Sequence, residues 1–183
     1  IETKLEETKT GGFACKLFDE VEADFIPNKK ATLADFEKMR AETLAKKAET
    51  LEANKKKKGY VDKLNKDSFF NYKLNKTDGV HERKEEHDPE NDDYIIGIRP
   101  EFIEHADKDE PGIDAIVYAA MPSGMETTIR MVINGFIVTG VIFGANDYTI
   151  NEKIRVTFKG NSILLFDKTS ENLISVGSLK IKK

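Results

Sequence analysis

The sequence predicts a mainly β protein, a small barrel or sandwich that carries a long charged helical insertion. Short runs of alternating apolar and polar residues occur near both ends of the chain, and turn residues instead of helices separate them. In the middle, 31 of the 66 residues at positions 28–93 are charged, and the apolar period changes to three or four. We therefore expect residues 1–27 and 94–183 to form one β domain into which residues 28–93 are inserted.

The first strands are expected before residue 27. Residues 11–17 and 21–25 each alternate in polarity, and the turn-forming pair Asp19 and Glu20 lies between them. This pattern predicts a hairpin.

The insertion is expected to open with a helix of about 25 residues. Thr32 and Asp35 have the spacing of a capping box, which predicts a start near Thr32. A run of lysines followed by Gly59 predicts the end, because cations favour the last turn and glycine accepts a positive φ. Arg40 and Lys47 interrupt a thin apolar stripe, so docking and protrusion of this helix both stay open.

The strongest strand pattern occupies residues 127–143. Asn134-Gly135 separates two apolar-rich runs and predicts a two-residue type I′ hairpin. That turn pairs Ile133 with Phe136, and the same face carries Met131 and Ile129, which we expect in the core. Further strands are predicted at 153–158 and 162–166, with a last extended piece at 173–176.

Composition excludes several classes of function. A net charge of −4 disfavours general nucleic-acid binding. No apolar run is long enough to span a membrane, and a single thiol, Cys15, cannot form an internal disulfide framework, which fits a reducing compartment. The first residue is not methionine, which leads us to expect a piece of a longer protein.

Patterns that would support catalysis or cofactor binding are incomplete. Gly135 and Gly140 have the spacing of a phosphate-binding loop but lack the following lysine. His81 and His87 are six apart, whereas zinc-binding histidines on a helix are four apart. Residues 88–93 resemble a calcium loop only in composition. We predict no catalytic, cofactor-binding or metal-binding residue.

Three ordered segments resemble one family. Residues 97–101 read G-I-R-P-E, which is similar to a motif in the ATP-binding subunits of sugar-importing ABC transporters of the maltose and multiple-sugar class. Residues 123–127, S-G-M-E-T, resemble that family's L-G-x-E-T segment, with Pro122-Ser123 near its usual leucine. Residues 154–158 and the later L-F-D at 165–167 resemble its closing strands.

The resemblance implies a TOBE-like regulatory domain, an OB-type β-barrel that follows an ATPase domain. It implies no enzyme activity for this chain, because ATP and magnesium would bind in the domain upstream. It also implies a homodimer, membrane subunits reached through the ATPase domain, a possible regulatory protein as partner, and a place in the cytoplasm at the inner face of the cell membrane. The candidate regulatory or interface residues are Gly97, Arg99, Pro100, Glu101, Ser123, Gly124 and Glu126.

Two other hypotheses remain open at this point. A free-standing OB-fold module would bind oligosaccharide or single-stranded nucleic acid, and it would need aromatic and basic residues on one sheet face. The main hairpin offers Arg130 there but no aromatic residue beside it. The insertion could instead dock a partner specific to this protein, in which case deletion of residues 30–92 should leave the barrel folded. The imported sugar is not encoded in these patterns.

Overall fold

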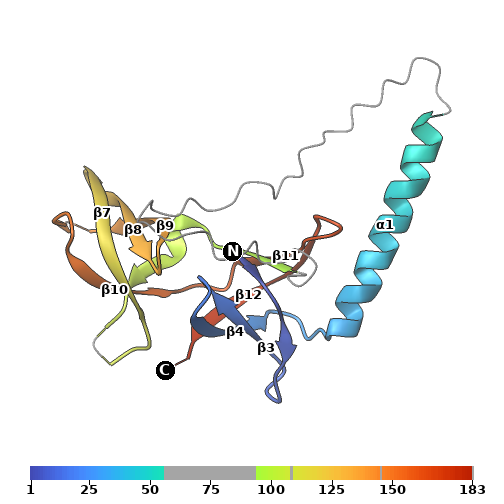
Figure 1. Cartoon of the computed structure of the whole chain (residues 1–183), viewed down its shortest axis with the longest axis horizontal. Coiled ribbons are helices and arrows are strands. Elements are labelled where there is room, and N and C mark those ends of the chain that lie inside the picture. The colour runs from blue at the N-terminus through green and yellow to red at the C-terminus, as the bar shows by residue number, and fades with distance from the viewer. Residues whose placement is uncertain (56–93, 108, 145, 183) are drawn as a thin grey trace.

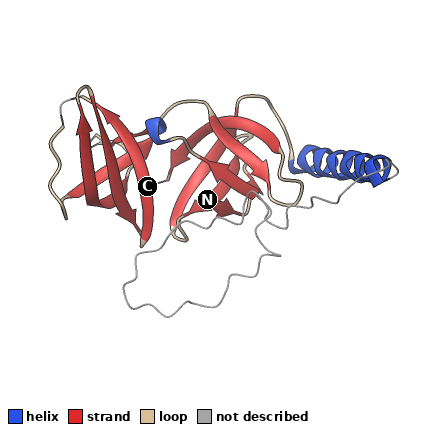
Figure 2. Ribbon diagram, turned by 90° about the horizontal axis from the view of Figure 1, so that it is seen from above, coloured by secondary structure: helices blue, strands red, loops and turns tan. Residues whose placement is uncertain are grey.

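The strands form two curled sheets that lie side by side as neighbouring lobes (Figures 1 and 2). The computed structural model describes residues 1–55, 94–107, 109–144 and 146–182. The mainly β, barrel-like character predicted from the alternating patterns is confirmed. One barrel was expected, however, and the strands of the described residues divide between two sheets.

The first sheet has seven strands drawn from both ends of the chain. Its order is β1 (Glu2–Thr3), β5 (Tyr94–Gly97), β11 (Ile163–Asp167), β12 (Leu173–Ile181), β4 (Val21–Pro27), β3 (Phe13–Leu17) and β2 (Glu6–Glu7). The outer parts of the sheet curl toward each other, since the backbone N–H of Lys16 donates to Thr3 Oγ1 at 3.1 Å. The hairpin predicted from residues 11–17 and 21–25 is confirmed as β3 and β4, although β3 begins two residues later, at Phe13.

The second sheet has five strands from one continuous stretch. Its order is β6 (Ile103–His105), β10 (Lys153–Phe158), β7 (Ile113–Ser123), β8 (Glu126–Ile133) and β9 (Phe136–Phe143). Its two outer strands, β6 and β9, also lie in contact. The whole sheet is inserted between β5 and β11, which are neighbours in the first sheet.

The β8–β9 hairpin has the predicted register. Asn134 and Gly135 have φ values of 46° and 83°, as a type I′ turn requires. Ile133 pairs with Phe136, and Met131 pairs with Val138. Ile129, Met131 and Ile133 are completely buried, so the predicted core face is confirmed.

One continuous core joins the two sheets. Buried apolar side chains from both belong to a single cluster. At the junction the rings of Phe18, in the β3–β4 turn, and Phe136, at the start of β9, lie 5.9 Å apart between centroids. Asn134 Nδ2 donates to the backbone oxygen of Phe18 at 3.4 Å.

The described helix, α1 (Leu33–Lys55), begins one residue after Thr32, which agrees with the start predicted near Thr32. The backbone N–H of Asp35 donates to Thr32 Oγ1, and the backbone N–H of Thr32 donates back to Asp35 Oδ2 at 2.9 Å. The hydrogen bond from the backbone N–H of Thr32 to the Asp35 carboxylate lowers the pKa of Asp35. Figure 2 shows α1 extending away from the lobe that contains the N-terminus.

The longer helical insertion is not confirmed. The described part of it is α1, which has 23 residues. The predicted helix end at Gly59, both histidines at 81 and 87, and the acidic run at 88–93 lie outside the described residues. In the part of the chain that the structure describes, no helix has the length and apolar character needed to cross a membrane.

Gly177 fixes the approach of β12 to β4. A Cβ atom there would lie 2.2 Å from the backbone oxygen of Ile26. We expect Gly177→Ala to lower the free energy of unfolding by about 1–3 kcal/mol, because one strand must move away. Gly97→Ala is the matched control, since its Cβ would meet side chains and no backbone atom, the nearest being the ring edge of Phe166 at 3.2 Å and Leu164 Cβ at 3.5 Å. Urea unfolding measures both, and equal losses would contradict this account.

Candidate interaction sites

The G-I-R-P-E segment forms the crossover from the first sheet to the second. Gly97 ends β5, and Pro100 and Glu101 begin the short helix η1 (Pro100–Phe102) that leads into β6. Arg99 has an extended backbone, and its oxygen accepts from the N–H of Phe102 at 3.0 Å. Arg99 and Glu101 are both exposed, and their side chains lie 4.0 Å apart, so the pair contributes little to stability.

The chain returns to the first sheet beside this crossover. The backbone N–H of Lys159 donates to the oxygen of Phe102, and the Phe102 ring covers Gly160, where a Cβ would lie 3.1 Å from it. The Lys159 ammonium lies 3.3 Å from Glu104 and 3.8 Å from Glu110. The hydrogen bond to Glu104 and the charge of Glu110 raise the pKa of Lys159. The G-I-R-P-E segment therefore belongs to a packed connection between the two sheets, formed by residues 97–102 and 159–160, which we call the joint.

The S-G-M-E-T segment forms the tip of the β7–β8 hairpin. Ser123 pairs with Glu126, and Gly124 in the turn has a φ of 69°. The side chain of Met125 is 84% exposed, and its backbone oxygen accepts from Gly144 at 2.9 Å. The tip of the β7–β8 hairpin is therefore exposed to solvent and accessible to a partner.

The structure does not bring the two predicted groups together. Arg99 and Glu101 contact each other at the joint, whereas Ser123 and Glu126 face each other across the hairpin. Among the described residues, no hydrogen bond or ion pair links the joint to the tip. The predicted residues therefore form two separate surfaces, and both are exposed.

An apolar outer face on the second sheet was missed by the sequence analysis. It runs from the tip over β7, β8 and β9, and its most exposed side chains are Ile116, Tyr118, Met121 and Phe143, at 43%, 52%, 55% and 64%. Residues on this face alternate with the core residues of the same strands. No signal in the sequence identifies this face until the register of β7 is known, because Ile116 and Tyr118 could equally be core residues. Tyr118 continues the outward alternation of β7, and the β-bulge there brings the next residue, Ala119, onto the same face, where it pairs with Arg130.

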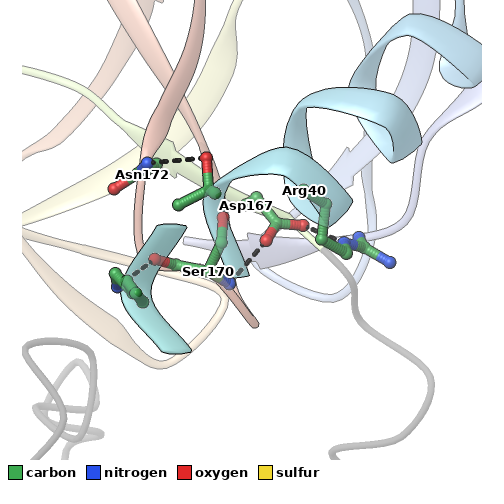
Figure 3. Close-up of polar contacts among 6 residues, drawn as sticks. Arg40, Asp167, Ser170 and Asn172 are labelled. Atoms are coloured by element: carbon green, nitrogen blue, oxygen red, sulfur yellow. Dashed lines mark hydrogen bonds and ion pairs between the residues drawn. The ribbon is translucent and has the colours of Figure 1, made fainter. Parts of the chain in front are cut away.

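A polar anchor for α1 was also missed. Arg40 Nε donates to Asp167 Oδ1 at 2.5 Å, and the second carboxylate oxygen accepts from the backbone N–H of Ser170 at 2.6 Å (Figure 3). Asp167 is 1% exposed, so its charge is compensated in a buried setting. Lys47 Nζ donates to the Ser170 oxygen, and Asn172 Nδ2 to Thr43 Oγ1. Arg40 and Lys47, which interrupt the apolar stripe, are therefore the docking residues.

Aromatic contacts complete the attachment of α1. Phe36 is 2% exposed, and its ring lies 5.1 Å from that of Phe13 and 6.1 Å from that of Tyr94. The Arg40 guanidinium lies 5.6 Å from the Tyr94 ring centroid. The helix therefore docks through residues 36, 40, 43 and 47, which share one face at helical spacing.

His105 has a partner that spacing alone did not identify. Its Nε2 lies 2.5 Å from the hydroxyl of Tyr148, and the two rings stack at 5.5 Å. Partial burial and the charge of Glu152 raise the pKa of Tyr148. The contact attaches the β9–β10 loop to β6.

Two other sequence features lie in the core or in turns. Gly135 serves the hairpin turn, and a Cβ at Gly140 would meet Met131 and Ile103, so the glycine spacing reflects hairpin geometry, as expected. Across the described ranges, no group of three or more potential metal ligands occurs.

The Cys15 thiol should be unreactive in the folded chain. Burial, reinforced by the charge of Asp24, raises its pKa to about 12 from an ordinary 9.0, and Sγ donates to the Ala23 oxygen. The neutral thiol thus stabilises the fold below pH 9, and this contribution is lost as the pH rises toward 12. At pH 8 we expect an aromatic disulfide reagent to modify the urea-unfolded chain rapidly and the native chain at least about 100-fold more slowly. Equal rates would contradict this placement.

No known family model matches the chain, and no curated protein matches it.

Proposed function

We propose that this chain is the regulatory part of the ATP-binding subunit of a sugar-importing ABC transporter. The observation that carries the proposal is the ordered resemblance at residues 97–101, 123–127 and 154–167. Those segments occupy the inter-sheet joint, the tip of the β7–β8 hairpin and the paired strands of one continuous β framework. This arrangement suits a protein-binding module, because the connection between the sheets is well packed and the second sheet has an exposed apolar outer face.

In this proposal the chain itself performs no chemistry. ATP and magnesium bind to an upstream ATPase domain, which contacts the membrane subunits at the inner face of the cell membrane. The regulatory module keeps two subunits paired while their ATPase domains open and close. The tip around Ser123, Gly124 and Glu126 belongs to the interaction surface, for the second subunit or a regulatory protein, whereas Gly97, Arg99, Pro100 and Glu101 hold the joint.

The coding sequence upstream of Ile1 tests this proposal. We expect it to encode, in the same reading frame, a glycine-rich phosphate loop that ends in Lys and Ser or Thr. A reading frame that starts at or just before Ile1 would contradict the proposal.

One observation favours a second candidate, an OB-type binder of oligosaccharide or single-stranded nucleic acid. The bulge places the exposed ring of Tyr118 next to Ala119, which pairs with Arg130, so an aromatic and a cation share the outer face. The chain has no tryptophan, so its intrinsic fluorescence comes from tyrosine. Titration with oligothymidylate and with maltooligosaccharide should leave this fluorescence unchanged if the regulatory proposal holds. Saturable quenching that Tyr118→Ala abolishes would support the binder instead.

A further inference from the structure

The outer face of the second sheet has a charge pattern that is complementary to itself. On β8 the outward residues are Glu126, Thr128, Arg130 and Val132, and those of β9 carry no charge. Glu126 and Arg130 lie at equal spacing on either side of Thr128. A strand rises about 3.3 Å per residue, so roughly 13 Å separates the two positions, which is too far for an ion pair within one chain. In the described part of the chain neither side chain has an ion-pair partner.

We infer that the outer face binds a second copy of this chain, with the two β8 strands antiparallel and a two-fold axis at Thr128. Rotation about that axis exchanges the positions of Glu126 and Arg130. Each Glu126 then faces Arg130 of the second copy, which gives two equivalent ion pairs in one isologous contact. Face-to-face sheets cross at about 30°, which keeps the central strands in contact.

The exposed apolar residues of the outer face also match one another under the two-fold rotation about the axis at Thr128. Ile116, Val132 and Ile137 form one row across the three strands, two rows from Thr128. Two rows from Thr128 in the other direction lies the hairpin tip, with its 84% exposed Met125. In the dimer, Met125 of each copy therefore contacts the row formed by Ile116, Val132 and Ile137 in the other copy. A flexible methionine suits this position, because it adapts to an irregular apolar surface.

The axial row supports the contact as well. Met121, Thr128 and Val141 pair across the sheet and lie on the two-fold axis. Each would contact its own equivalent, so uncharged side chains meet there. A group of exposed apolar side chains on one sheet face is typical of an interaction site.

A charge exchange tests this arrangement. Sedimentation of the 183-residue chain should show a dimer, and Glu126→Arg or Arg130→Glu alone should weaken it at least about tenfold, because like charges then face each other. The double variant Glu126→Arg/Arg130→Glu should restore the wild-type dissociation constant, since the exchange preserves both ion pairs. Only an antiparallel contact centred on Thr128 predicts this rescue.

A second pair of variants controls for folding. Met125→Lys should also weaken the dimer, whereas Met39→Lys on the exposed side of α1 should leave it unchanged, and circular dichroism should show folded chains in both cases. The inference rests on the proposed pairing of regulatory domains, but its failure is distinguishable. A wild-type dimer that the single variants do not weaken overturns this surface and leaves the proposed function intact. A wild-type monomer overturns it too.

Discussion

Replacing Phe36 with alanine should lower the free energy of unfolding by about 3–5 kcal/mol. The ring is 2% exposed and lies between Phe13 of β3 and Tyr94 of β5, so truncation leaves a cavity between α1 and the first sheet. Met39→Ala is the control on the same helix, because Met39 is 41% exposed and should change stability by less than about 0.5 kcal/mol. Urea unfolding followed by circular dichroism measures both. A loss below about 1 kcal/mol for Phe36→Ala would show that α1 is not part of the core.

The same contacts change the expectation for deleting residues 30–92. If the insertion served only to dock a partner, the barrel would stay folded without it. Phe36 belongs to the core cluster, and Arg40 compensates the charge of Asp167. The deletion removes both, so we now expect it to destabilise the first sheet.

Asp167→Ala should cost about 3 kcal/mol of unfolding free energy. The change removes the acceptor for the buried N–H of Ser170 and the counter-charge of Arg40. We place the value at the low end for a buried pair because the Arg40 side chain is 23% exposed and keeps some contact with water. Hydrogen exchange should also become faster in the first turns of α1, since Arg40 loses its anchor.

Lys168→Ala provides the matched control for Asp167→Ala. The Lys168 ammonium lies 3.2 Å from Glu2 in a more exposed pair, and its loss should cost less than about 1 kcal/mol. Similar losses for the two variants would contradict the anchor described above.

Local signals in the sequence predicted local structure well. The Asn134-Gly135 turn specified its own hairpin register, because both positions need a positive φ and a two-residue loop fixes the pairing. Thr32 and Asp35 specified the start of α1 in the same way, through hydrogen bonds three residues apart. Elements with this property can be assigned from a single sequence.

Long-range partners could not be assigned in this way. Alternating patterns identify strands but do not show which strands pair, so the division into two sheets was missed. Asp167 and Arg40 are 127 positions apart, and no spacing rule relates them. The outer face was missed because an exposed Ile116 or Tyr118 is indistinguishable in sequence from a core residue until the register of β7 is known.

ATP hydrolysis by the complete product of the gene tests the central proposal most directly. If this chain is the regulatory part of a transporter ATP-binding subunit, the complete protein should hydrolyse ATP in a magnesium-dependent manner, and the 183-residue chain should show no activity above buffer. A complete product that neither contains a phosphate loop nor hydrolyses ATP would contradict the proposal.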